Sequence, residues 1–268
     1  MSKENFLSTV TVLDTETTSL HANQAEIVEI AGAVYDGKTW QIKDTLLGAK
    51  NGIPPEASAK NHISSRMING LPTFSESVDL VCNILRWPSS KYWVAHNSSY
   101  DQEVMAHAWV NSNNLSYIEL AIDNSRWICT HRLAKQLLPF NFNDMQYNLN
   151  YLRYKLDLLI PDSFGSHRAA VDALTCATLF EFLINYAIET NVVTNDSTLG
   201  EQIHALCWKP FHIDKWPFGK HKGKLLSEID TDYLIWAGNN VDCLNDKLPQ
   251  FDFDLSFNFL AELEKRIG

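Results

Sequence analysis

The chain has 268 residues, of which 45% are apolar, 32 are acidic and 22 are basic. A chain of this length and composition can bury a substantial core in one large domain, with room for a small second one, and is not disordered. The formal net charge of -10 excludes a protein coated with positive charge for nonspecific duplex binding, but it leaves room for a local basic track.

The cysteines and the N-terminus bear on the compartment. The five cysteines are dispersed and include no C-x-x-C pair, which indicates a reducing compartment and argues against disulfides and zinc. The short apolar stretch at the N-terminus runs straight into a candidate motif at Asp14, so a cleaved signal peptide would remove that motif. No uncharged apolar run approaches the roughly 18 residues that a membrane span needs. We therefore expect a soluble, cytoplasmic protein with no membrane partner.

The first part of the chain is rich in extended segments. Apolar and β-branched runs predict three strands, over residues 6–13, 27–35 and 40–47. Asp36-Gly37 is a tight-turn signal between the last two strands, which indicates a three-stranded meander.

Helices and short strands then alternate. The apolar spacing predicts helices over residues 75–87, 100–110, 131–138, 148–156 and 168–188, with short strands over 92–95 and 127–129. Strands followed by strand-helix alternation indicate an α/β domain, in which helices flank a mixed sheet.

A polar stretch, NVVTNDST over residues 191–198, is the best linker candidate. It divides the chain into an expected catalytic domain over residues 1–190 and a small C-terminal module over residues 199–268, which we expect to be α/β and to bind DNA. This module contains the segment PFGKHKGK, an apolar-periodic stretch over residues 233–236 and a final helix over residues 255–267.

Carboxylates mark three distant places in the chain. Asp14 and Glu16 are two residues apart at the end of an expected strand, so they face the same side and can reach one cation, whereas Thr15 points the other way. Asp101 follows a strand at a helix start. Taken singly, each of these residues is better explained by a structural or solvated role. Gathered in one pocket they would repel one another, so together they predict magnesium or manganese.

His167 and Asp172 form the third place. Their spacing of five residues separates them by about 140° on a regular helix. His167 is therefore expected in the preceding loop or the first turn, and Asp172 on the helix proper. This arrangement suits a mobile base beside a fixed metal ligand.

Read together, DTETTSL at residues 14–20, HNSSYD at 96–101 and HRAAVDA at 167–173 resemble the three motifs of the DEDDh, or DnaQ-like, 3′-to-5′ exonucleases. The segments WICTHRLAKQLLP, FGKHKGK and YLIWAGNN are similar to the bacterial exodeoxyribonuclease X branch of this family and extend the resemblance over nearly the whole chain. The resemblance implies an RNase H-like fold. It also implies that two Mg²⁺ ions, replaceable by Mn²⁺, are held around the scissile phosphate by Asp14, Glu16, Asp101 and Asp172.

In the same scheme His167 accepts a proton from the attacking water. Thr15 and Thr17 would line the pocket for the terminal nucleotide, and Leu20 would be an apolar wedge beside the terminal base. The family usually has Gly before this wedge, where this chain has Ser19.

Two further substrate contacts are expected on the same grounds. Asn97 belongs to the second motif. His62 stands where many members have a His-x-Ile element, although here Ile63 comes one place early.

A lysine-rich loop lies in the tail. Its lysines are interleaved with Trp216, Phe218 and His221, and they are Lys215, Lys220, Lys222 and Lys224. We expect Lys220, Lys222 and Lys224 to contact phosphates while the aromatics stack on exposed bases. The alternative is a solvated lysine loop whose Trp216 and Phe218 pack inward.

These observations favour a metal-dependent 3′-to-5′ exodeoxyribonuclease that acts on DNA 3′ ends and releases 5′-mononucleotides from single strands, with duplex ends as a possible second substrate. An RNA-trimming enzyme of the same superfamily is the first alternative. A catalytically silent module that binds nucleic acid or protein is the second, and the presence of all five chemical residues argues against it.

Overall fold

The protein is described here by a computed structural model that covers residues 2–138, 146–160, 168–245 and 252–267. It divides into two compact units, Met1–Cys207 and Trp208–Gly268.

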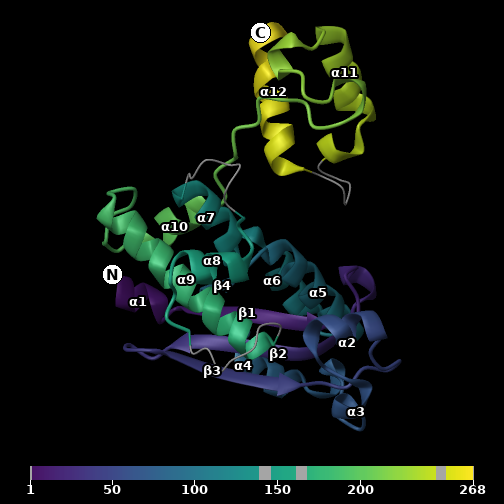
Figure 1. The fold of residues 1–268 in the computed structure, drawn as a ribbon, viewed down its shortest axis with the longest axis vertical. Helices are drawn as coiled ribbons and strands as arrows, with labels where there is room; N and C mark the ends of the chain where they lie inside the picture. Colours follow the sequence, from purple (N-terminus) through teal and green to yellow (C-terminus); the bar gives the residue numbers. More distant parts are fainter. Residues whose placement is uncertain (1, 139–145, 161–167, 246–251, 268) are drawn as a thin grey trace. The chain divides into compact units, whose positions relative to one another are not determined.

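The first unit is built on a five-stranded sheet in the order β3-β2-β1-β4-β5 (Figure 1). The strands are β1 (Val10–Thr17), β2 (Ile27–Tyr35), β3 (Trp40–Leu46), β4 (Tyr92–Ala95) and β5 (Trp127–Cys129). The first three pair antiparallel, and β4 and β5 run parallel to β1. The expected meander and the RNase H-like mixed sheet are confirmed.

Helices cover both faces of this sheet. They are α1 (Lys3–Leu7), α2 (Pro55–Asn61), α3 (Ser65–Ile68), α4 (Val78–Leu85), α5 (Ser98–Asn111), α6 (Leu115–Ile122), α7 (Thr130–Leu137), α8 (Leu149–Lys155), α9 (Ala169–Glu189) and α10 (Leu199–Cys207). Side chains of α4, α5 and α6 share one buried core with Leu13, Ile30 and Trp93 of the strands. Helix α9 packs across β1, β2 and β3 and contacts Ala31 of β2. Residues that alternate along β1 therefore serve two different sides of the sheet.

The start of the chain differs from the sequence prediction. A strand was expected over residues 6–13, but residues Lys3–Leu7 form helix α1 and the strand begins at Val10. Phe6 packs edge-on against Tyr92 and Phe180. Tertiary packing of these rings decides the local conformation, and a run of neighbouring apolar residues does not reveal it.

Helix α9 is the single described helix that is long and apolar enough to cross a membrane, with 21 residues and a mean hydropathy of 1.4. Just over half of the apolar stretch is buried, and the helix packs on the sheet. These properties are those of a core helix, and length with composition is weak evidence for a membrane span.

The first unit extends beyond the expected domain boundary. Helix α10 packs on β5 and α7, where the backbone N–H of Cys129 donates to Cys207 Sγ at 3.1 Å and Arg132 Nε donates to the Cys207 carbonyl at 2.9 Å. The expected linker over residues 191–198 therefore lies inside this unit, and the division falls between Cys207 and Trp208. The sequence does not show that α10 packs on β5 and α7, so it does not place this helix in the first unit.

The second unit is helical. It contains α11 (Thr231–Asn240), α12 (Phe253–Ile267) and short 3₁₀ turns at Gly219–His221, Leu226–Glu228 and Asp242–Leu244. Its described residues include one isolated β-bridge, Lys215 with Leu225, and no strand, so the expected α/β character is corrected. The Trp216 N–H donates to the Lys224 carbonyl at 2.9 Å and the Leu226 N–H donates to the Asp214 carbonyl at 2.7 Å, and these two bonds form the bridge. The core is built around the buried Trp216 and Phe259.

Candidate active site

The structure brings three of the predicted carboxylates together. Asp14 and Glu16 lie near the end of β1, and Asp172 lies in the first turn of α9. One carboxylate oxygen from each lies within 4.8 Å of the others. The chain brings Asp172 to this point because α9 packs directly on β1.

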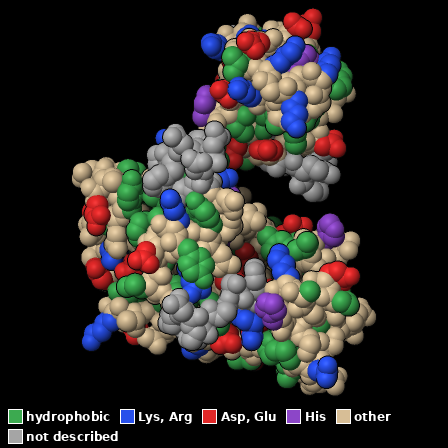
Figure 2. Space-filling model, in the orientation of Figure 1, with side chains coloured by type: hydrophobic (Ala, Val, Ile, Leu, Met, Phe, Trp, Pro, Cys, Tyr) green, Lys and Arg blue, Asp and Glu red, His purple; other side chains and the backbone are tan. Residues whose placement is uncertain are grey.

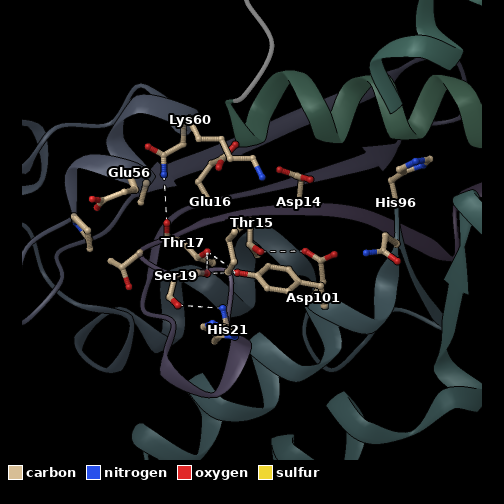
Figure 3. A pocket seen from close by; sticks show the side chains of 17 residues that line it. Asp14, Thr15, Glu16, Thr17, Ser19, His21, Glu56, Lys60, His96 and Asp101 are labelled. Carbon is tan, nitrogen blue, oxygen red and sulfur yellow. Dashed lines mark hydrogen bonds between the residues drawn. The ribbon is translucent and has the colours of Figure 1, made fainter. Parts of the chain in front are cut away.

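Asp101, the fourth predicted carboxylate, lies outside this group of three but lines the same pocket as Asp14 and Glu16. It lies in the first turn of α5, is buried, and accepts a hydrogen bond of 3.0 Å from Thr15 Oγ1 (Figure 3). Asp14 and Asp101 line the same pocket. Thr15 therefore orients a carboxylate with its side chain, as its position between Asp14 and Glu16 on the strand allows.

The pKa values of these carboxyls reflect burial first and, for Asp14 and Glu16, the charges of neighbouring carboxylates. Burial, then the charges of Asp101 and Asp172, raise the pKa of Asp14 well above its usual range. Burial, then the charge of Asp172, raises the pKa of Glu16 to about 7. Burial raises the pKa of Asp101 to about 7, against the hydrogen bond from Thr15. Hard oxygen donors that lie this close together form a donor set that fits a divalent metal ion.

This crowding predicts a pH dependence of metal stabilisation. Because the folded carboxyls have raised pKa values, the folded state binds more protons than the unfolded state from about pH 4 to about pH 7, and the metal-free protein loses stability as the pH rises through that window. Excess Mg²⁺ relieves the repulsion of the ionised groups. We expect the Mg²⁺-induced rise in the unfolding temperature to be larger at about pH 8 than at about pH 5.5, as measured by thermal unfolding. An equal rise at both pH values would contradict the assignment.

A pocket of about 720 Å³ opens beside the carboxylates (Figure 3). Its walls come from β1 and the following turn, from α2, and from the start of α5; they include Thr15, Thr17, Ser19, Leu20, Glu56, Lys60, Asn61, His96, Asn97 and Tyr100. The predicted wedge, Leu20, is 75% exposed. The pocket therefore offers an apolar side chain and several hydroxyls next to an anionic wall.

Tyr100 was not singled out from the sequence, yet it fixes the turn that carries Leu20. Its hydroxyl lies 2.6 Å from Thr17 Oγ1 and donates to the Ser19 carbonyl at 2.6 Å. Thr17 Oγ1 donates to the same carbonyl at 2.9 Å. The signal was present in the HNSSYD motif, where a tyrosine immediately precedes Asp101.

The sequence also pointed to His62, but the structure does not bring it to the pocket. Helix α2 ends at Asn61, and His62 follows with a left-handed backbone, φ 60°, and an exposed side chain. Asn61 instead lines the pocket and donates to the Thr17 carbonyl at 3.4 Å. A spacing-based reading cannot foresee this reversal of direction at the helix end.

His96 and Lys60 are two further pocket residues that the sequence reading missed. His96 Nε2 donates to the Tyr147 carbonyl and its Nδ1 lies 2.9 Å from Thr130 Oγ1. Burial lowers the pKa of His96 to about 4, so the ring is neutral near pH 7 and serves as a structural link. Lys60 lies near enough to Glu16 to oppose the rise of its pKa.

His167 lies outside the described residues. The described chain resumes at Arg168, which precedes α9. Asp172 lies in the first turn of α9, and the expected placement of His167 before it stays a prediction.

The lysine loop of the second unit carries two aromatic rings, which the sequence left as either stacking platforms for bases or inward-packed side chains. Trp216 is 0% exposed and packs on the half-buried Phe218, with ring centroids 4.9 Å apart. The inward-packing alternative therefore holds for both rings. The side chains of Lys220, Lys222 and Lys224 are exposed. On the visible face, Lys and Arg side chains are interspersed with Asp and Glu (Figure 2), in keeping with the acidic composition.

Comparison with known proteins identifies a family whose model matches this chain. The family model RNase_T, described as exonuclease, matches residues 11–180, a range that contains all four carboxylates and His167. Exodeoxyribonuclease 10 of Escherichia coli (strain K12) is 28% identical over 242 residues, which cover 88% of this chain and 94% of that protein. DNA polymerase III subunit epsilon of Treponema pallidum (strain Nichols) is 30% identical over 182 residues, 68% of this chain and 79% of that protein.

Solved structures of exonucleases are also similar to this chain. Exonuclease X in complex with 5′ overhanging duplex DNA superposes with a TM-score of 0.51 at 26% identity, covering 74% of this chain and 99% of that chain. E. coli Exonuclease I in complex with a dT13 oligonucleotide superposes with a TM-score of 0.56, covering 69% of this chain and 43% of that chain; at 12% identity this likeness concerns the fold alone.

Proposed function

The chain belongs to the exonuclease family, and from this membership we propose that it is a metal-dependent 3′-to-5′ exodeoxyribonuclease. It releases 5′-mononucleotides from single-stranded DNA, with duplex ends as a possible second substrate. The observation that carries the proposal is the meeting of Asp14, Glu16 and Asp172 beside a pocket that Asp101 also lines.

Asp14, Glu16, Asp101 and Asp172 would hold two Mg²⁺ ions, for which Mn²⁺ can substitute. When bound, such ions supply a water of lowered pKa and stabilise negative charge on the scissile phosphate. The carboxylates suit this task because they are hard oxygen donors brought close together, and because a bound cation would offset the cost of ionising them in this buried site.

The remaining residues bind and orient the substrate. The backbone around Thr15 and Thr17 would face the terminal nucleotide, and Leu20, held through Ser19 by Tyr100, would pack beside the terminal base. Asn97 lines the same pocket. His167 would accept the proton of the attacking water and pass it to solvent. Lining up the reacting groups in one pocket supplies much of the catalysis.

DNA is favoured over RNA as the substrate because the relatives are exodeoxyribonucleases or DNA polymerase subunits by name, and two of the solved structures hold DNA. An RNA-trimming enzyme is the alternative. A silent binding module is disfavoured because the four carboxylates are all present.

The test is a time course with 5′-labelled oligonucleotides as single-stranded DNA, duplex DNA and RNA, with Mg²⁺ present or chelated. We expect products that shorten stepwise from the 3′ end of DNA with Mg²⁺, no products with EDTA, and slower shortening of RNA. Faster shortening of RNA would favour the alternative, and no shortening of any strand would contradict the proposal.

The second unit is proposed to retain the DNA strand. Lys220, Lys222 and Lys224 would contact phosphates. Because Trp216 and Phe218 pack inward, the bases would stack on two residues of α11 instead. Lys220 Nζ lies 4.8 Å from the centroid of the Tyr233 ring, and the Trp236 ring lies 5.4 Å from Tyr233. Trp236 is 51% exposed, so its face is available to a base.

This placement predicts a length-dependent effect of Trp236→Ala. We expect about tenfold weaker binding of long single strands, because an aromatic platform contributes about 1–3 kcal/mol per stacked base. Hydrolysis of a very short oligonucleotide should be unchanged. Fluorescence anisotropy and single-turnover cleavage measure the two quantities.

Phe257→Ala is the matched control for this variant. Phe257 is 53% exposed, lies on α12 of the same unit, and is not among the rings that pack with Trp236. Replacing Lys222 by Ala should also weaken the salt dependence of binding. Equal effects of the two aromatic variants would contradict the role of Trp236.

A further inference from the structure

Glu29 is a charged residue in the middle of an apolar strand. It lies on β2 directly opposite Glu16 of β1, and it is 0% exposed. A buried carboxylate is unfavourable unless it is paired and hydrogen-bonded. Its partner is Arg168, the residue that precedes α9.

The contacts of Glu29 anchor the start of α9. Arg168 Nε donates to both carboxylate oxygens at 3.1 Å, and Arg168 Nη2 donates to Oε1 at 2.6 Å. The backbone N–H of Ala169 donates to Oε2 at 3.0 Å. The residue at the N-cap position of α9 is Arg168, whose own side chain makes no capping bond. Glu29 therefore caps the helix from a neighbouring strand, at the positive end of the helix dipole.

The turn that Glu29 anchors carries Asp172. Arg168 and Asp172 are four residues apart, and the Asp172 N–H donates to the Arg168 carbonyl at 3.0 Å. Ala31, Ala169 and Ala173 form a small buried cluster between β2 and α9. These short side chains let the helix lie close to the sheet, so the position of its first turn sets where Asp172 meets Asp14 and Glu16.

We propose that Glu29 and Arg168 are positioning residues that hold Asp172 in place beside Asp14 and Glu16, so that the three can share one divalent cation. The inference rests on the metal centre of the proposed function. Glu29 acts through hydrogen bonds and is not a ligand, because both of its oxygens accept from Arg168 and Ala169. Arg168 also offsets the charge of Glu29, which would otherwise add to the repulsion at Glu16.

The test compares Mn²⁺ binding to the full-length protein by isothermal titration calorimetry, without substrate. We expect Glu29→Gln and Arg168→Gln each to raise the Mn²⁺ dissociation constant about tenfold or more, as losses of residues that orient metal ligands do. The double variant should cost little more than either single one, because both act through one contact. Arg168→Lys keeps the charge but not the fork of donors, and should recover only part of the affinity.

Glu181→Gln is the matched control. Glu181 also lies on α9 and pairs with Lys3 at 3.0 Å and with Trp40 Nε1 at 3.1 Å. This variant should lower the unfolding temperature without changing the Mn²⁺ dissociation constant. If Glu29→Gln does not fold, Arg168→Gln and Arg168→Lys carry the test.

Two results would overturn the inference. The first is wild-type Mn²⁺ affinity in folded Arg168→Gln, and the second is an equal loss of affinity in Glu181→Gln, which would indicate a general effect on the helix. If the unaltered protein binds no Mn²⁺, the proposed metal centre fails as well. If the unaltered protein binds Mn²⁺ and the Arg168 variants bind it equally well, only the positioning role is lost.

Discussion

Asp14→Asn is expected to reduce nucleotide release by at least about a thousandfold, equivalent to about 4 kcal/mol of transition-state stabilisation. The charges of Asp101, Asp172 and Glu16 all raise the pKa of Asp14, so Asp14 is central to the carboxylate cluster. Asparagine keeps the shape of the side chain but removes the charge that would hold a cation. Single-turnover cleavage of a labelled oligonucleotide gives the rate.

The same variant should still bind DNA. Removing one negative charge from the pocket lessens repulsion of phosphates, so anisotropy should report affinity equal to or above that of the unaltered protein. The control is Asp79→Asn, an exposed residue in the first turn of α4, which should cleave normally. Normal turnover by Asp14→Asn would remove Asp14 from the mechanism, and loss of both binding and turnover would indicate misfolding.

His167→Ala is expected to lower turnover by about a hundredfold to ten-thousandfold, the range typical of a lost general base. Its role differs from that of Asp14 because it is not a metal ligand in the proposed mechanism. DNA binding and the Mg²⁺-induced rise in the unfolding temperature should therefore remain.

The comparison of the two variants separates their roles. If His167→Ala loses the Mg²⁺-induced rise as Asp14→Asn does, His167 helps to hold the metal. If it turns over at nearly the normal rate, another group accepts the proton. His212→Ala, at an exposed position of the second unit, serves as the control and should behave normally.

The sequence was a good guide where the information is local or carried by motifs. Alternation and turn signals placed β2, β4 and β5 at their observed bounds. Asp172 meets Asp14 and Glu16 because α9 packs on β1, and Asp101 lines the same pocket as these two residues of β1.

Two of the misses share one physical cause, which is contact between residues far apart in the chain. Phe6 is helical because it packs on Tyr92 and Phe180. The domain division falls after Cys207 because that thiol lies against the backbone of Cys129. Such partners are invisible to composition and periodicity.

Glu29 is the most instructive of these cases. A lone acid in an apolar strand signals a buried charge that needs a partner, but the sequence does not say that the partner is Arg168 or that Ala169 donates to it as well. The motif HRAAVDA contains Arg168, which pairs with Glu29, as well as His167, the expected base. Its arginine therefore has a structural role that is separate from the expected chemistry. The register of β1 with β2 and the packing of α9 on the sheet determine these contacts of Glu29, which the motif alone does not predict.

The most direct test of the central claim is anomalous diffraction from crystals grown with Mn²⁺ and a short single-stranded DNA. The account predicts manganese peaks bound by Asp14, Glu16 and Asp172, with Asp101 beside them and the 3′ end of the strand in the pocket lined by Leu20. A folded protein that degrades DNA in the same solution, yet shows these carboxylates apart and no manganese among them, would contradict it.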